Sequence, residues 1–302
     1  MIFEKPVRKL QRPRGKRGPS VQITPRDLSM MKYIWRWKIA STASIHEAIN
    51  QTSSPYSTYK ILDRLEKNCF LECRFELTER FYVWQLTELG FHAIKAHLGD
   101  LKEDGYLSEN HRHDRLVQAF QLGEWSTHQF PQTQFFTEQD LRRRELADYP
   151  DWVPHTTDHR PDGYTKMTGH KKPWTVAYEV ELSAKNVQKY EGILRFYQMA
   201  RMVDRVMWLV GSDHIRDTIL RAKQCIKEDS ANYHVFVDRI DFEKYGWDAE
   251  VKNERSETLF TMREKYRGIY GGTAGEIIGN LKGPTAVTAH LANQKVIGKS
   301  RA

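Results

Sequence analysis

Three carboxylates and one amine near the middle of the chain have the types and spacing of a site that cuts phosphodiesters. Asp162 lies in a Pro-Asp-Gly turn, and Glu179, Glu181 and Lys185 follow in the segment Glu-Val-Glu-Leu-Ser-Ala-Lys. Neighbouring carboxylates repel each other, and Mg²⁺ or Mn²⁺ would compensate them because hard cations take oxygen ligands. We therefore predict a metal-dependent site in which all four residues are catalytic. The expected metal ligands are Asp162, Glu179 and Glu181.

A buried strand over 174–182 must position two of these acids. Side chains alternate along a strand, so Glu179 and Glu181 are expected on one face. The other face then carries Tyr178, Val180 and Leu182. The alternative interpretation of the cluster is an inactive remnant or a set of surface ion pairs.

The surrounding pattern predicts an α/β unit with a mixed sheet, in the order α-β-β-β-α-β and then α-β. The expected helices cover 109–125, 183–202 and 213–227, with a short helical turn at 138–145. The expected strands cover 132–137, 163–167, 174–182, 206–210 and a last one at 233–240. Ser183 is expected to cap the helix over 183–202, although it could also touch a phosphate. Tyr190 and Tyr197 fall on the inner stripe of that helix, as core aromatics or, in the alternative, as a covalent nucleophile.

The front of the chain predicts three helices, a hairpin and a further helix. Thr24-Pro25 and Ser54-Pro55 are typical helix starts. A short helix is expected over 43–49. Two strands are expected over 71–77 and 80–86, followed by a helix from Thr87 through Ile94. The third helix should turn Thr58, Ile61, Leu62, Leu65 and Cys69 inward. Its opposite side carries Ser57, Lys60, Arg64 and Lys67, which are either DNA contacts or a solvated face.

This order of elements resembles a winged helix-turn-helix domain, whose third helix enters the major groove. The expected wing tip, near Glu76 and Glu79, is acidic apart from Arg80. Wing contact with DNA is therefore not expected, and the domain could instead mediate dimerisation or bind a protein.

The first twenty residues are strongly basic. They hold seven Lys or Arg against one Glu, so a net +6 of the chain's +8 lies there. Pro and Gly interrupt the segment, which cannot pack a core. It is either a solubilising tail or a phosphate-binding arm, whose candidate DNA contacts are Arg12, Arg14, Lys16 and Arg17.

The acidic motif and its order of elements resemble the PD-(D/E)XK restriction-endonuclease-like nucleases. In this sequence Glu181 stands where that pattern has its lysine, and Lys185 comes four residues later, as in members whose lysine has moved to the following helix. A narrower resemblance is to the plasmid replication-relaxation group and its MobC-type relaxases. This resemblance rests on the winged helix, on a first helix with His111 and His113, and on the Phe-Thr-Glu138-x-x-Leu-Arg segment. It also rests on Pro-Asp-Gly and on Glu-Val-Glu-Leu-Ser-x-Lys followed by Tyr190 and Tyr197.

The resemblance implies a DNA nickase acting at a plasmid origin of transfer or replication. Its implied partners are double-stranded DNA and, as candidates, relaxosome accessory or coupling proteins. His111, His113, Glu138, Ser183 and Tyr190 are candidate accessory residues. The His111-Arg-His113 segment is not the His-hydrophobic-His relaxase signature, because its middle residue is Arg and alternate residues of a helix do not share a face. The alternative function is a non-catalytic DNA-binding regulator or mobilization accessory protein.

Composition sets the remaining expectations. Met1–Leu10 lacks the apolar core of a signal peptide, no apolar run approaches ~20 residues, and three scattered cysteines fit a reducing cytoplasm. We expect a basic arm (1–22), a winged helix (23–98), a linker (99–108), a nuclease-like domain (109–260) and a tail (261–302). Neither the oligomeric state nor the recognised DNA sequence is indicated.

Overall fold

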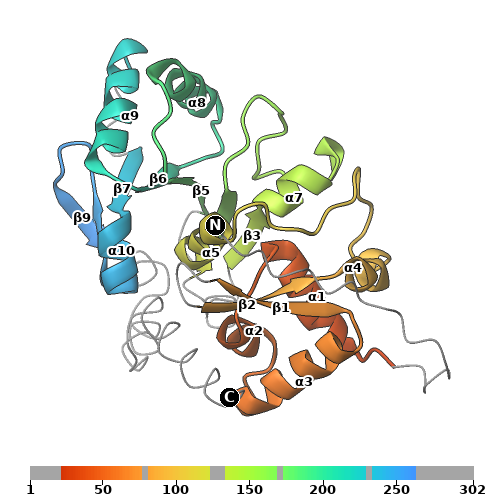
Figure 1. Ribbon diagram of the computed structural model, residues 1–302. Coiled ribbons are helices and arrows are strands. Elements are labelled where there is room, and N and C mark those ends of the chain that lie inside the picture. Colours follow the sequence, from red (N-terminus) through yellow and green to blue (C-terminus); the bar gives the residue numbers. More distant parts are fainter. Residues whose placement is uncertain (1–21, 77–80, 123–132, 169–172, 229–232, 263–302) are drawn as a thin grey trace, which may run out of the picture.

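The computed structural model describes residues 22–76, 81–122, 133–168, 173–228 and 233–262 (Figure 1). Its first part is a helical unit with a two-stranded hairpin. The elements are α1 (Pro25–Trp37), α2 (Thr42–Ile49), α3 (Pro55–Lys67), β1 (Leu71–Glu76), β2 (Phe81–Leu86) and α4 (Glu88–Lys95). This is the order expected from the sequence. The basic arm, the tip of the hairpin and the segment after 262 lie outside the described residues.

Side-chain caps begin the helices of this unit. The Thr24 side chain accepts a hydrogen bond from the Asp27 N–H, and the Asp27 carboxylate accepts one from the Thr24 N–H, which is a capping box. Ser41, Ser54 and Thr87 cap α2, α3 and α4, each through a side chain that accepts from a backbone N–H in the first turn. The two Ser/Thr-Pro helix starts are confirmed.

The core of this unit includes Met30, Met31, Ile34, Leu62 and Trp84. The inward assignment of Cys69 is wrong: Cys69 is exposed and has a positive φ of 62°. The helix ends at Lys67 and Asn68 caps it, so Cys69 already belongs to the turn into β1.

The second part is built on one seven-stranded mixed sheet. Its strands are β3 (Thr133–Thr137), β4 (Gly163–Met167), β5 (Trp174–Glu181), β6 (Arg205–Val210), β7 (His234–Asp238), β8 (Glu250–Lys252) and β9 (Thr258–Thr261), in that spatial order. β5, β6 and β7 are parallel, and the other neighbours are antiparallel. The mixed sheet is confirmed. The expectation of a last strand at 233–240 is wrong, because α10 (Arg239–Tyr245), β8 and β9 follow it.

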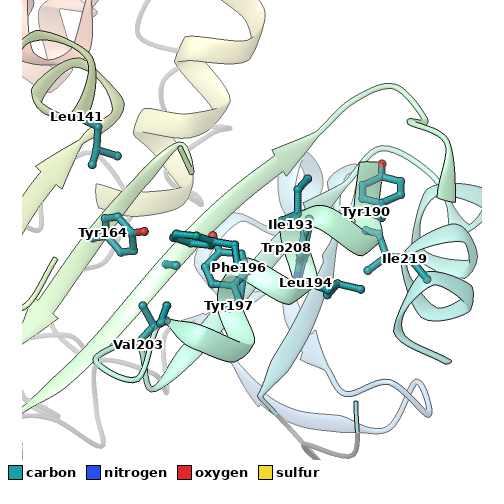
Figure 2. Packing of buried hydrophobic residues seen from close by; sticks show 14 of the residues in the cluster. Leu141, Tyr164, Tyr190, Ile193, Leu194, Phe196, Tyr197, Val203, Trp208 and Ile219 are labelled. Carbon is teal, nitrogen blue, oxygen red and sulfur yellow. The ribbon is translucent and has the colours of Figure 1, made fainter. Parts of the chain in front are cut away.

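Helices cover both faces of this sheet. α5 (His111–Leu122) packs with Leu116 and Phe120 against Tyr178 and Val180. The opposite face carries α8 (Val187–Met199) and α9 (Asp213–Cys225). Figure 2 shows residues of α8, among them Tyr190 and Tyr197, packed in one cluster with Tyr164 and Trp208 of the sheet. The alternation predicted for β5 is therefore confirmed.

Residues 99–110 pack against both parts of the molecule. The Gly105 carbonyl accepts hydrogen bonds from Trp35 Nε1 (3.0 Å) and from Gln139 Nε2 (2.8 Å). Lys102 N–H donates to the Arg143 carbonyl of α7 (Glu138–Arg143). The segment expected as a linker thus bridges α1 and α7.

A buried lysine forms ion pairs between the two parts of the molecule. Lys38 ends α1 with a φ of 64° and is 8% exposed. Its Nζ lies 2.6 Å from Asp114 Oδ1 on α5 and 2.7 Å from Glu138 Oε2 on α7. Burial alone would lower the pKa of Lys38, but the charges of Asp114 and Glu138 outweigh it and raise the pKa. One ammonium group therefore ties α1 to two elements of the sheet unit.

Replacing Lys38 with Met should destabilise the protein by about 3–5 kcal/mol, because it removes one partner of a buried ion pair and leaves His113 as the cation beside Asp114. Lys32→Met is the control: it removes an exposed lysine from the same helix and should change stability by less than ~0.5 kcal/mol. Urea unfolding of both variants measures the difference. Equal, small effects of the two substitutions would contradict a structural role for Lys38.

Candidate active site

The pairing of β4 with β5 brings Asp162 beside Glu179. Gly163 pairs with Tyr178, so Asp162, one residue earlier in this antiparallel ladder, comes opposite Glu179. Gly163 has a φ of 152°, and a Cβ there would lie 2.5 Å from Gln121 Nε2. Only glycine therefore suits this position, which explains the Pro-Asp-Gly turn.

The Asp162 carboxylate continues the hydrogen bonding of the sheet. Its Oδ2 accepts from the Val180 N–H at 2.6 Å, and its Oδ1 lies 3.4 Å from His113 Nε2. Burial raises the pKa of Asp162 to about 7; His113 opposes this rise and the Glu179 charge adds to it. Asp162 and Glu179 are thus close enough for their charges to interact.

Glu179 is buried between an imidazole and a phenol. Its Oε1 lies 2.6 Å from His159 Nε2 and accepts a hydrogen bond from the Tyr197 hydroxyl. Burial alone would lower the pKa of His159, but the Glu179 charge and hydrogen bond outweigh it and raise the pKa. His159 is therefore the cation that compensates Glu179.

Glu181 pairs with Lys185, four residues further along the chain. Lys185 Nζ donates to Glu181 Oε1, and the Tyr190 hydroxyl lies 3.5 Å from Oε2. Burial raises the pKa of Glu181, and Lys185 opposes that rise. For Lys185, burial would lower the pKa, but Glu181 first, and Glu179 and Asp162 after it, raise it. Lys185 therefore lies within electrostatic range of all three predicted catalytic acids.

The segment carrying Lys185 is not helical, although the sequence predicted a helix over 183–202. α8 begins at Val187, and its cap is Asn186, whose side chain accepts from the Lys189 N–H. The expectation that Ser183 caps this helix is wrong, and Ser183 is exposed. The non-helical segment 182–186 lets the Lys185 side chain turn back to Glu181.

His113 connects the site to the buried lysine. Its Nδ1 lies 3.5 Å from Asp114 Oδ1, the oxygen that also contacts Lys38, and its Nε2 faces Asp162. Burial and Lys38 would lower the pKa of His113, but Asp114 and Asp162 outweigh them and raise it to about 9. A continuous line of alternating charges thus runs from Lys38 through Asp114 and His113 to Asp162.

The other accessory candidates are divided between the site and its surroundings. Glu138 adjoins the site, because its N–H donates to the Asp162 carbonyl while its side chain contacts Lys38. His111 does not line the site: its ring faces Glu76 and Gln85 of the hairpin. These contacts fit the interpretation of His111 as a structural histidine rather than as a site residue, since the helix turns it away from His113.

The candidate DNA contacts of α3 differ in their engagement. Lys60 is exposed and lies over the Tyr56 ring, 4.7 Å from its centroid. Arg64 Nη2 lies 2.5 Å from Asp27 Oδ1, in the capping box of α1. Ser57 is half-buried, and its N–H donates to the capping Ser54. Arg64 thus has a structural partner, and Lys60 is the more accessible cation of this face.

The carboxylates of the site are the kind of ligand that a hard divalent ion takes, but the three side chains do not point to one common position. Asp162 and Glu179 supply carboxylate oxygens from adjoining strands, which is what Mg²⁺ or Mn²⁺ prefers. Within the ranges that the structure describes, however, no three His, Cys, Asp or Glu side chains are arranged to hold a metal. Glu181 is turned to Lys185 rather than to the other two acids.

Several residues of the site were not found from the sequence. His159 lies in a polar loop, and its only sequence signal was the loop's richness in His and Asp. Asp114 and Lys38 carry no motif, and Lys38 is more than seventy residues from its partner on α5. Lys38 and Asp114 come together only when the first unit packs against α5 and α7.

The chain was compared with family models, with curated proteins and with solved structures. No family model matches the chain, and no curated protein matches it. One solved structure, restriction endonuclease FokI, is similar over 80% of this chain and 46% of its own, at 10% identity and a TM-score of 0.22. The chain spans less than half of that structure, and such a TM-score does not establish a shared fold. No helix among the described residues is long and apolar enough to cross a bilayer.

Asp162→Asn should stabilise the protein at alkaline pH. A carboxyl whose pKa rises from 3.8 to about 7 on folding favours the folded state below pH 4, and that contribution is lost as the pH rises through 7. Asn carries no charge and can still accept from the Val180 N–H. At pH 8 the gain should be at most the ~4 kcal/mol implied by the shift, because that net shift already includes the attraction to His113.

Urea unfolding at pH 4.5 and pH 8 measures this gain, with Glu191→Gln on α8, outside the cluster, as the control. The difference between Asp162→Asn and the wild type should shrink toward pH 4.5. A variant that is less stable than the wild type at pH 8 would show that the Asp162 charge stabilises the fold instead.

Proposed function

We propose that this chain is a DNA-binding, metal-dependent endonuclease that nicks DNA at an origin of transfer or replication of a mobile element. The observation that carries the proposal is the convergence of Asp162, Glu179, Glu181 and Lys185 where β5 ends. The carboxyl ends of parallel strands are a common place for sites in α/β proteins. Three acids and a lysine there fit phosphodiester chemistry.

The order of elements supports the same class. An antiparallel meander of β3, β4 and β5 is followed by α8 and then by β6, which is parallel to β5 and next to it. α5 precedes the meander and covers the face opposite α8. Apart from the short α7 between β3 and β4, this is the α-β-β-β-α-β order for which the sequence resembles PD-(D/E)XK nucleases. Asp162 directly precedes the second strand of the meander, and Glu179 and Glu181 lie on the third.

The chain's own residues have distinct roles in the proposed reaction. Lys185, held by Glu181, would stabilise the negative charge that develops on the phosphate. His113 and the Val180 N–H fix the orientation of Asp162, and Tyr197 and His159 fix that of Glu179. Asp162 and Glu179 would hold Mg²⁺ or Mn²⁺, which supplies a Lewis acid when bound.

A tyrosine nucleophile is not favoured. Tyr197 and Tyr190 are buried, and burial, together with the nearby Glu179 or Glu181, raises the pKa of both hydroxyls. An ionised phenolate is therefore costly at either position, and both phenols act better as hydrogen-bonding partners of the carboxylates. We propose hydrolysis by water in place of a covalent tyrosine intermediate.

The first unit would supply the DNA contacts in this proposal. Lys60 on the exposed side of α3 and the basic arm would meet the double-stranded DNA of the origin, as in a winged helix. A relaxosome accessory or coupling protein would be the partner if the chain acts in mobilization.

One observation favours the alternative, a non-catalytic DNA-binding regulator or accessory protein. Each carboxylate of the cluster already has a protein cation: His113 for Asp162, His159 for Glu179 and Lys185 for Glu181. A cluster compensated in this way needs no metal to be stable. The two functions make opposite predictions for nicking.

Nicking of supercoiled, origin-bearing plasmid in Mg²⁺ or Mn²⁺ tests the proposal. Asp162→Asn, Glu179→Gln and Lys185→Met should each lower the nicking rate by about 10²–10³-fold, the usual loss when one charge-stabilising group is removed from an active site. Affinity for the same DNA, measured by fluorescence anisotropy, should stay within about threefold, roughly 0.7 kcal/mol.

Glu191→Gln is the matched control and should nick like the wild type. Calorimetric titration with Mn²⁺ gives a readout that does not depend on turnover: the heat of binding should disappear in Asp162→Asn. If the wild type binds origin DNA but neither nicks it nor binds Mn²⁺, the regulator function is correct.

A further inference from the structure

A hollow of about 340 Å³ lies where the first unit meets α7, away from the acidic cluster. Its wall includes Lys32 and Arg36 of α1, His97 after α4, and Arg144 after α7. Apolar atoms of Trp35 and Leu98 are also part of the lining. The hollow thus combines several cationic groups with an apolar surface.

A buried carboxylate orients two of these cations from opposite sides of the junction. Arg144 Nε lies 3.1 Å from Asp140 Oδ1, and Arg36 Nε lies 3.7 Å from Asp140 Oδ2. Asp140 is 2% exposed and is itself held by the capping box of α7.

The lining carries more positive charge than its protein partners neutralise. Asp140 balances one of the two arginines, and Lys32 is exposed with no acidic partner in the described part of the chain. His97, also exposed, would add charge below its ordinary pKa of ~6.5. An anion with several oxygens could meet a lysine and two arginines from different directions, whereas a single carboxylate offers only one plane.

We propose that this hollow binds a phosphate group of a nucleic acid or nucleotide. The site needs no residue of the acidic cluster, so it does not depend on the proposed nuclease function. Because Lys32 and Arg36 come from α1 and Arg144 from the sheet unit, the bound phosphate bridges the two parts of the molecule. The volume of the hollow is at the low end of the range for small-ligand pockets, so the hollow fits one phosphorylated group rather than a large cofactor.

Two binding measurements on the full chain test the site and distinguish the sources of the phosphate. Calorimetry with pyrophosphate, with malonate as a carboxylate comparison, reports binding of a free phosphate compound. Anisotropy of a 16-base-pair DNA duplex over a range of salt reports binding of the backbone. Lys32→Gln and Arg144→Gln should each weaken binding about tenfold, as expected for a charge-assisted contact, and each should lower the salt slope for DNA by about 0.9.

The control removes two exposed cations elsewhere, Arg195→Gln on α8 with Lys227→Gln after α9, and should leave both measurements unchanged. An effect on pyrophosphate alone assigns the site to free nucleotides, and an effect on the duplex alone assigns it to the DNA backbone. Because Lys32 is exposed, Lys32→Gln should fold normally and tests the site even if Arg144→Gln does not fold. Wild-type behaviour of Lys32→Gln in both measurements, or malonate binding as tightly as pyrophosphate, would overturn the proposal. Asp162→Asn should bind both probes like the wild type, whatever its nicking activity.

Discussion

The buried ammonium group of Lys38 joins the two parts of this molecule, together with the His111 contacts to the hairpin and the Arg36–Asp140 ion pair. Lys38 reaches from the end of α1 to Asp114 on α5 and Glu138 on α7, at 2.6 and 2.7 Å. Removing a charge from water is costly, so such a contact persists only where both partners are well placed. α5 carries His113 one residue before Asp114, and α7 begins at the residue whose N–H donates to the Asp162 carbonyl. The position of the acidic cluster therefore depends on the docking of the first unit.

The acidic cluster is arranged to keep three carboxylates buried together. Asp162, Glu179 and Glu181 each face one cationic partner, and each of these partners comes from a different segment of the chain. Burial still raises the pKa of Asp162 and Glu181, which means that the compensation is incomplete. The fold gives up stability to keep these acids in one place. Raised carboxyl pKa values of this kind are found at functional sites and in structural ion-pair networks.

The sequence predicted the parts of the fold that local physics decides. Helix starts at Thr24 and Ser54 follow from capping, and the opposed faces of Glu179 and Tyr178 follow from the period of a strand. The cap at Ser183 failed because a Ser is only one of several residues that can cap, and Asn186 lies closer to the first apolar position of the helix. β8 and β9 were missed because they are short and follow a helix that carried no clear pattern.

The candidate site was predictable only in its central motif. Asp162, Glu179, Glu181 and Lys185 are marked by their chemistry and spacing, and the pairing of β4 with β5 brings them together. His113 was a predicted accessory residue, but Lys38 and His159 were not predictable, because they reach Asp114 and Glu179 through contacts between segments far apart in the sequence. His111 and His113 look equivalent in the sequence, and only the packing of α5 against both the hairpin and the sheet separates them.

The most direct test of the line of charges from Lys38 to Asp162 is an NMR titration of the His113 imidazole in the full chain. The chain has twelve histidines, so the signal would be assigned by its loss in His113→Gln. We predict a pKa of about 9 in the wild type, and a still higher value in Lys38→Met, because the lysine charge opposes protonation of the ring. A wild-type pKa near the ordinary ~6.5, unchanged when Lys38 is replaced, would contradict the account.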